Sequence, residues 1–311
     1  MSQILRFLIL SFFISFLLSA CSQTVDKDIV PEGQQMKVVT TTSILKDAVQ
    51  NIVGDAALVE SVMGSGVDPH LYKATQGDLN KLTEADMIIY NGLHLEGKMG
   101  EVLEKLSRLK TVVAATEGIP VTGLRKSPQF QDSYDPHVWF DVQLWQQVVK
   151  YLTQELKRKD PKNAKVYQQR TAIYLKELEE LHTTTVNAIV SIPEQQRILI
   201  TAHDAFGYFG DAYNIKVRGL QGISTVSEFG LQDVSSLVNF IADNKIRAVF
   251  VESSVSPKAI EAVVEGSRQK GHQVKIGGTL YSDALGADDT AEGTYVGMVK
   301  YNVKNIVGAL K

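Results

Sequence analysis

The sequence predicts an α/β protein in which two strand–helix sets, each with a parallel sheet, are joined by one long helix. Three observations carry this prediction. Apolar or β-branched runs alternate with helical patterns from residue 37 to residue 114, and a second such alternation occupies residues 197–310. Between them, residues 161–192 contain no glycine and, after Pro161, no proline. Alternating strands and helices favour parallel sheets covered by helices, and the uninterrupted segment favours a single helix.

Composition places the chain among soluble globular proteins. Its 311 residues, 44% apolar and 22% charged, suffice for two domains and are too polar for a polytopic membrane protein. The 32 Lys and Arg residues against 35 Asp and Glu residues give a net charge of −3, so no electrostatic reason points to nucleic acid or anionic lipid as a partner. The single cysteine, Cys21, excludes a disulfide scaffold, a zinc ribbon and an iron–sulfur centre.

Residues 1–20 have the features of a signal peptide. Arg6 precedes a run of apolar residues and serines that is shorter than the roughly 20 residues needed to span a bilayer. The run ends Leu-Ser-Ala-Cys21, which looks like a bacterial lipobox, whose cysteine is acylated and becomes the mature N-terminus. An ordinary signal peptide with a chance cysteine is the alternative. We expect an exported protein, lipid-anchored through Cys21 to the outer face of the cell membrane or in the periplasm, with residues 21–36 as a flexible tether.

The first lobe is predicted at residues 37–160. Strands are expected at 37–42, 57–63, 87–90 and 111–114, where the runs are apolar or β-branched. Helices are expected at 44–53, 76–84 and 100–109, and Gly54 marks the end of the first of these. This order is typical of a sheet of parallel strands with helical crossovers.

The connecting helix is predicted at residues 161–192. Apolar and hydroxyl residues recur every three or four positions, at Tyr167, Thr171, Tyr174, Leu178, Leu181 and Thr185. Proline at the first turn starts the helix, and Pro193 ends it. At 1.5 Å per residue such a helix is roughly 45 Å long, so it would form a rigid rod between the lobes.

The second lobe is predicted at residues 193–311. Strands are expected at 197–202, 215–217, 248–251 and 274–276, and helices at 232–243, 257–270 and 292–310. Ligands of open parallel sheets bind outside the carboxyl ends of the strands, so the loops that follow the strands are the places to search for a site.

Three histidines and one aspartate occupy such loops. The tripeptide Asp-Pro-His occurs twice, ending at His70 and at His137, and His203 directly follows a predicted strand. Asp283 lies in the loop after the last strand. Three imidazoles and a carboxylate would make a closed nitrogen and oxygen site for a divalent transition metal. The alternative is ordinary loop chemistry, because Asp-Pro is a common turn opener and no local metal-binding signature is present.

The other three histidines are weaker candidates. His182 lies beside the apolar stripe of the long helix and is expected to pack or to lie on the helix surface. His272 follows Gly271 and is expected in a turn. His94 follows a predicted strand and could approach the cleft. Asp204 and Glu252 are candidates for orienting the imidazoles, although Glu252 at a strand end could equally form a structural ion pair.

Longer segments carry a family resemblance. The sequence Asp135-Pro-His-Val-Trp-Phe-Asp141 resembles a motif of the metal-binding lipoproteins of bacterial ABC importers, the cluster A-I or TroA-like family. Further similar segments follow at Thr201-Ala-His-Asp-Ala-Phe-Gly-Tyr-Phe209, Gly219-Leu-Gln-Gly-Ile-Ser224, Phe250-Val-Glu-Ser253, Ile276-Gly-Gly278, Tyr281-Ser-Asp-Ala-Leu285 and Glu292-Gly-Thr-Tyr-Val-Gly-Met298. The resemblance covers the chain from Lys37 onward.

The resemblance implies two Rossmann-like lobes with parallel sheets, joined by one long backbone helix, with one metal ion in the interlobe cleft. Matched motif by motif, the ligands fall on His70, His137, His203 and Asp283, whereas the stretch with His94 lies outside the metal shell. It implies an extracytoplasmic solute-binding lipoprotein that captures Zn²⁺ or Mn²⁺, with Fe²⁺ a further candidate, and delivers it to an importer's permease, which works with a cytoplasmic ATPase. We expect a monomer.

The cargo and the class of protein leave alternatives open. Zinc specialists of the family often carry a His-rich loop, but residues 116–133 contain no histidine, which counts against a zinc specialist. A surface adhesin of the same fold is the alternative function. A secreted zinc hydrolase would need an open coordination position and a general base, and four protein ligands leave little room for them, so we expect no enzyme activity.

Overall fold

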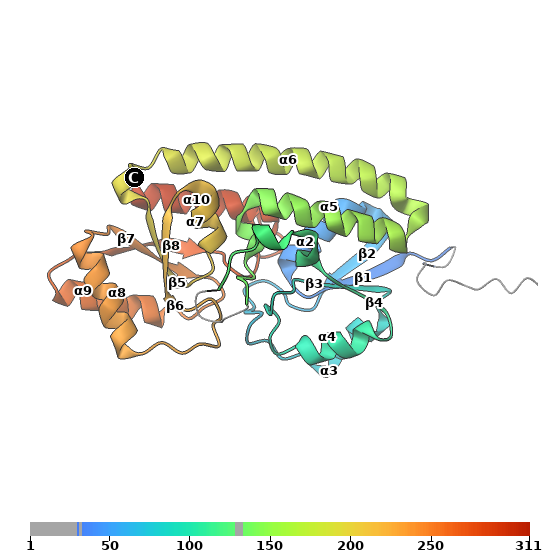
Figure 1. The fold of residues 1–311 in the computed structure, drawn as a ribbon, viewed down its shortest axis with the longest axis horizontal. Coiled ribbons are helices and arrows are strands. Elements are labelled where there is room, and N and C mark those ends of the chain that lie inside the picture. The colour runs from blue at the N-terminus through green and yellow to red at the C-terminus, as the bar shows by residue number, and fades with distance from the viewer. Residues whose placement is uncertain (1–29, 31–32, 128–132) are drawn as a thin grey trace, which may run out of the picture.

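The computed structural model describes residues 30, 33–127 and 133–311. The predicted signal peptide and Cys21 lie outside these residues. The described chain forms two α/β lobes beneath one long helix, α6 (Ala164–Val190), which runs along the molecule in Figure 1. In this part of the chain no helix is both long and apolar enough to cross a membrane.

The first lobe is built on a parallel four-stranded sheet in the order β2-β1-β3-β4. On the face opposite α6 lie α3 (Gln76–Glu84) and α4 (Gly100–Ser107), whereas α2 (Ser43–Val53) lies on the side of α6 (Figure 1). The strands are β1 (Met36–Thr40), β2 (Ala57–Ser61), β3 (Met87–Tyr90) and β4 (Thr111–Ala114). The predicted elements of this lobe are therefore confirmed, with ends that differ by one or two residues.

Local chemistry explains the boundaries of α2. The Thr42 hydroxyl caps the first turn by accepting from the Leu45 backbone N–H at 3.3 Å. The buried face contains Leu45, Val49 and Ile52, spaced three or four residues apart as a helix requires. Gly54 ends the helix at φ 57° and ψ −134°, a positive-φ conformation that glycine adopts without a Cβ penalty.

A second long helix packs against the connecting helix. The predicted connecting helix corresponds to α6, preceded by a short 3₁₀ turn at Pro161–Asn163, and its predicted stripe is buried. The neighbouring α5 (Val142–Lys159) was not predicted. Asp141 caps α5 by accepting from the Gln143 N–H at 2.8 Å. The Thr153 and Thr171 hydroxyls lie 2.8 Å apart where α5 and α6 pack together.

The second lobe contains two parallel strand pairs, β5-β6 and β7-β8, with β5 beside β7. Its strands are β5 (Ile198–His203), β6 (Lys216–Gln221), β7 (Ala248–Glu252) and β8 (Lys275–Leu280), and its helices are α7 (Gly207–Tyr213), α8 (Leu231–Asp243), α9 (Lys258–Gln269) and α10 (Tyr295–Leu310). Strands β6 and β8 are longer than predicted. Glycines interrupt the apolar pattern in both, so the predicted ranges ended too early. At Gly219 a Cβ would lie 2.5 Å from the Asp204 nitrogen, so only glycine fits there.

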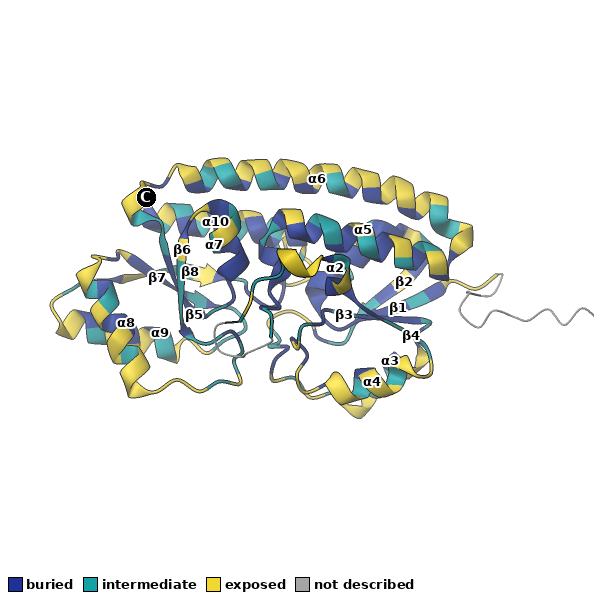
Figure 2. Ribbon diagram, in the orientation of Figure 1, coloured by how far each residue is buried: buried dark blue, intermediate teal, exposed yellow. Residues whose placement is uncertain are grey.

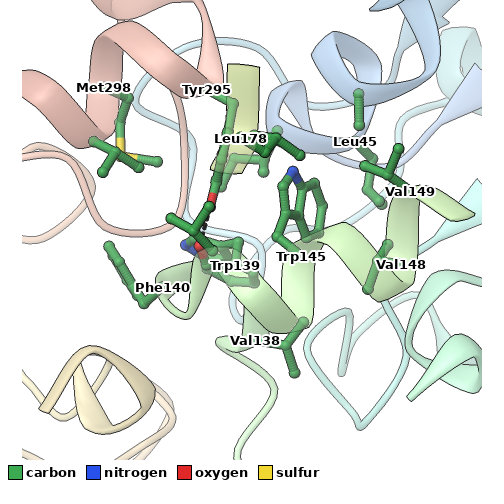
Figure 3. Close-up of a cluster of buried hydrophobic side chains, with 14 of the residues drawn as sticks. Leu45, Val138, Trp139, Phe140, Trp145, Val148, Val149, Leu178, Tyr295 and Met298 are labelled. Atoms are coloured by element: carbon green, nitrogen blue, oxygen red, sulfur yellow. Dashed lines mark hydrogen bonds between the residues drawn. The ribbon is translucent and has the colours of Figure 1, made fainter. Parts of the chain in front are cut away.

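The largest hydrophobic core joins the lobes. Trp139, Trp145 and Tyr295 are fully buried and lie together with Leu178 of α6 in Figure 3. The Tyr295 hydroxyl donates to the Trp139 carbonyl oxygen at 2.7 Å, and its ring stacks on Trp145 with centroids 5.4 Å apart. Figure 2 shows that much of α5 is buried, whereas α6 also carries many exposed residues. The start of α10 therefore packs into a core that it shares with first-lobe helices.

Candidate metal centre

The structure brings together the four side chains that the sequence singled out. His70, in the loop after β2, and His137, just before α5, come from the first lobe, whereas His203 ends β5 and Asp283 follows β8 in the second. All four are buried, and one potential ligand atom from each lies within 4.8 Å of the others. The carboxyl ends of strands in both lobes therefore meet at one cluster, as expected for open parallel sheets.

The nitrogen and oxygen atoms of the cluster face one another at its centre. The Nε2 atoms of His70 and His137 lie 3.3 Å apart. Asp283 Oδ2 lies 3.4 Å from His203 Nε2, and its Oδ1 lies 3.5 Å from His137 Nε2. Both carboxylate oxygens therefore face imidazole nitrogens.

Two atoms of the cluster, His203 Nε2 and Asp283 Oδ1, are buried without a hydrogen-bond partner among the described residues. An unpaired buried polar atom costs about 1–3 kcal/mol. A cation at the centre would satisfy both atoms, so this donor set fits a divalent transition metal.

Carboxylates hold two of the imidazoles from behind. His137 Nδ1 donates to Asp135 Oδ1 at 2.7 Å, and the His137 backbone N–H donates to the same oxygen at 3.0 Å. His203 Nδ1 donates to Glu252 Oε2 at 2.5 Å, and its backbone N–H donates to Oε1 at 2.8 Å. A carboxylate on Nδ1 fixes the tautomer and leaves Nε2 free to bind an ion.

Of the two residues that were predicted to orient the imidazoles, one contacts a histidine ring and the other does not. Glu252 contacts the ring of His203, as the sequence analysis suggested. Asp204, the other candidate, makes no hydrogen bond to an imidazole of the cluster within the described chain. Asp135 was not predicted to orient an imidazole, although it stands two residues before His137 in one of the repeated tripeptides.

Both Asp-Pro-His tripeptides also form the turn that their composition predicts. In each, the aspartate accepts a hydrogen bond from the histidine backbone N–H, at 2.8 Å for Asp68 and 3.0 Å for Asp135. Asp68 does not bind its histidine ring but accepts at 2.7 Å from the hydroxyl of Thr225 in the second lobe. Turn chemistry and a role at the cluster therefore coexist.

The side chains of the cluster differ in the direction in which their pKa values are shifted. Burial lowers the pKa of His70 to about 3; the charge of Asp283 opposes this shift, and the charges of the other two imidazoles reinforce it. Burial also disfavours a charged His203, but the carboxylates of Glu252 and Asp283 outweigh it and hold the pKa of His203 well above its usual value. For Asp283, burial is outweighed by the three imidazoles, which keep its pKa low. Near neutral pH, without an ion, the cluster therefore contains an ionised Asp283 beside a protonated His203.

The remaining histidines lie outside the cluster. His182 of α6 contacts the ring of Tyr213, with ring centroids 5.6 Å apart. His272 bonds through Nε2 to the Ile246 carbonyl oxygen at 2.7 Å, before β8 begins. His94 is exposed, in the loop between β3 and α4. The expectations for His182 and His272 as packing and turn residues agree with these contacts.

The fold and the cluster define a class of protein: two-lobed α/β proteins whose lobes together bury a set of metal-ligand side chains. The chain belongs to the family described as zinc-uptake complex component A, periplasmic (ZnuA), whose sequence profile matches residues 38–309. This family contains substrate-binding proteins of zinc and manganese ABC importers, so the predicted TroA-like resemblance is confirmed.

Several relatives are similar over almost their whole length. The chain is 47% identical to the manganese-binding lipoprotein MntA of Bacillus subtilis over 299 residues, 96% of this chain and 97% of the relative. It is 46% identical to the zinc-binding protein TroA of Treponema pallidum over 284 residues, 91% of each chain. The manganese ABC transporter substrate-binding lipoprotein PsaA of Streptococcus mitis is 30% identical over 285 residues, 89% of this chain and 90% of the relative.

The solved structure of Treponema pallidum TroA, a periplasmic zinc-binding protein, superposes on this chain with a TM-score of 0.87 at 46% identity. The match covers 89% of this chain and 99% of that one, which confirms the predicted fold class. The names of these relatives describe metal binding and metal transport. They do not favour the surface-adhesin alternative.

Proposed function

We propose that this protein captures one divalent transition-metal ion outside the cytoplasm and delivers it to the membrane permease of an ABC importer, which works with a cytoplasmic ATPase. The ion would be held by His70, His137, His203 and Asp283. The observation that carries this assignment is the buried cluster itself, in which two polar atoms have no hydrogen-bond partner within the described chain. Family membership supports the role in import. Burial of all four ligands suits an ion that is carried rather than used in catalysis.

The donor atoms suit both zinc and manganese. Three imidazole nitrogens favour zinc, because manganese stands at the weak end of the divalent series and prefers oxygen. Both oxygens of Asp283 face the imidazoles, and a bidentate carboxylate would give five donors, more than the four of a tetrahedral zinc site. We therefore propose a site that accepts either ion.

The protein would act as a monomeric binding protein and not as an enzyme. Metal-dependent hydrolysis requires a coordination position open to water and substrate. The four candidate ligands of this cluster are all buried and would leave little room for such a position. His137 and His203 are further fixed by carboxylates on their outer nitrogens, which favours retention of the ion over exchange with a substrate.

A metal titration tests the proposal directly. The soluble form, residues 22–311, should bind one Zn²⁺ or one Mn²⁺ per chain, measured by elemental analysis and competitive titration with a chelating indicator. The variant His137→Ala should lose stoichiometric binding, whereas His182→Gln, which removes an imidazole outside the cluster, should retain it. Much tighter zinc binding, with no stabilisation of the fold by manganese, would identify zinc as the cargo. Absence of stoichiometric metal in the wild-type chain would contradict the proposal.

We further propose that acylation of Cys21 anchors the protein to the membrane. Names of relatives as lipoproteins support this proposal, although Cys21 itself lies outside the described residues. Val30, the first described residue, contacts the first lobe: its N–H donates to the Lys159 carbonyl oxygen at 3.2 Å. In bacteria fed alkyne-labelled palmitate, the full-length protein should incorporate the label and Cys21→Ser should not. Ser22→Ala, beside the anchor, should remain labelled; equal labelling of Cys21→Ser would refute the anchor.

A further inference from the structure

A cavity of about 440 Å³ borders one residue of the candidate metal centre. The first lobe contributes His70, His94 and Lys98 to its walls, and the second lobe contributes Ile223, Ser224 and Val226. Of the four cluster residues, only His70 lines it. A cation that approaches the cluster through this cavity therefore meets His70 before the other three ligands.

His94 is a second imidazole on the wall of the same cavity. It is exposed, and within the described chain its ring makes no hydrogen bond. A Cβ placed on Gly97 would lie 3.7 Å from the His94 carbonyl oxygen and 3.9 Å from the His70 carbonyl oxygen, so the two histidine backbones converge around Gly97. His94 also lines a neighbouring cavity of about 580 Å³ together with Glu104 and Glu117. It therefore lines two neighbouring cavities, one of which also borders His70.

The backbone at His94 is held in an unfavourable conformation. Leu93 and His94 have φ values of 51° and 65°, and each left-handed non-glycine residue costs on the order of 1–3 kcal/mol. The buried carboxylate of Glu96 supports this turn by accepting from the backbone N–H of Asn91 at 2.6 Å and of Gly92 at 3.3 Å. The surrounding structure therefore fixes a strained turn that presents an unpaired imidazole at the cavity wall.

We propose that His94 is a transient metal ligand, which binds an incoming ion at the mouth of the 440 Å³ cavity and passes it to His70. This inference rests on the proposed function. A neutral imidazole binds transition-metal ions readily, whereas Mg²⁺ and Ca²⁺ prefer oxygen ligands. One imidazole without further protein ligands binds weakly, so the ion can move on. The transfer is a ligand substitution: the metal–His94 bond breaks as the bond to His70 Nε2 forms, with no change in oxidation state.

A ligand that binds the ion only in transit changes the rates of metal association and dissociation but not the Kd of the final site. The variant His94→Asn removes the imidazole, and asparagine tolerates the left-handed conformation. Association and dissociation rate constants should both fall by about tenfold, with little change in Kd. His94→Asp, of nearly the same shape, restores a ligand and should retain fast association. His272→Gln removes an imidazole far from the cavity and should behave as the wild type.

The measurement uses the soluble chain, residues 22–311, with Zn²⁺ or Mn²⁺ as the probe. Stopped-flow tryptophan fluorescence reports binding, because Trp139 lies against the ring of His137 with centroids 5.3 Å apart. Dissociation is measured by mixing the loaded protein with a chelator, and thermal melts of each metal-free variant check the fold.

Three results would overturn the role of His94. The first is an unchanged association rate in His94→Asn. The second is a larger Kd and a faster dissociation rate in His94→Asn, which would mean that His94 supports the structure of the site. The third is an association rate in His94→Asp as slow as in His94→Asn, which would exclude coordination. Each differs from failure of the proposed function, in which the wild-type chain itself would bind no stoichiometric metal.

Discussion

Replacement of Asp283 by asparagine is expected to weaken metal binding by roughly two to four orders of magnitude. Asp283 is the only carboxylate among the four candidate ligands, and it is buried with both oxygens toward the imidazoles. Removing one partner of a buried charge pair costs about 3–5 kcal/mol, and each 1.4 kcal/mol is tenfold in Kd. Asparagine keeps the shape of the side chain but lacks the charge and offers one oxygen. Competitive titration at fixed pH measures the change.

A neighbouring residue provides a matched control. Asp204 directly follows His203, and its carboxylate forms no part of the cluster. Asp204→Asn makes the same chemical change and should leave Kd within a few-fold of the wild-type value. Thermal melts of both metal-free variants check that each remains folded. If Asp283→Asn bound zinc as tightly as Asp204→Asn does, Asp283 would not be a ligand.

The positions of three of the four cluster residues follow from a physical rule. His137, just before α5, was singled out instead by its Asp-Pro-His tripeptide and by the family resemblance. Strand ends in an open parallel sheet converge, so polar side chains in the loops after β2, β5 and β8 have a common place to meet. The rule does not give distances or orientations. That both oxygens of Asp283 face imidazoles depends on how the two lobes pack, which no local pattern in the sequence encodes.

Orienting groups were harder to predict than the cluster itself. Asp204 is next to His203 in sequence, but successive side chains at the end of a strand point to opposite sides. The carboxylate that contacts His203 is Glu252, on the adjacent strand β7 and 49 residues away. For His137 the orienting carboxylate is local, because the turn formed by Asp135 brings its Oδ1 to both the backbone and the ring. Sequence proximity is therefore a poor guide unless a turn closes the distance.

The two helices absent from the sequence analysis differ in how predictable they are. α5 has a clear signal, with Asp141 at its N-cap and an apolar stripe that includes Trp145, Val148 and Leu152. α7 has only seven residues, two of them glycines, and ends at Asn214 in a left-handed conformation. A helix of that length depends on tertiary packing, and α7 buries Tyr208, Phe209 and Tyr213.

Metal affinity should rise by about tenfold per pH unit between roughly pH 6 and 8, with one proton released for each ion bound. The source of the proton is His203, whose pKa burial would lower but Glu252 and Asp283 hold well above the usual value. In the metal-free protein His203 is then protonated near neutral pH, and an ion must displace that proton to reach Nε2. Lower pH favours the protonated competitor, so affinity falls as pH falls. His70, with a pKa of about 3, is neutral throughout this range and adds nothing to the slope.

The variant Glu252→Gln isolates the cause of this pH dependence. Glutamine can still accept from His203 Nδ1, but the charge that most strongly raises the pKa of His203 is gone. The pKa of His203 should fall, so the variant should release less than one proton per ion and show a shallower slope. Calorimetric titration in buffers of different ionisation enthalpy counts the protons, and Kd measured at three pH values gives the slope. Two outcomes would contradict the argument: a wild-type affinity independent of pH, or a slope in Glu252→Gln as steep as in the wild type. The second would assign the displaced proton to a group other than the His203–Glu252 pair.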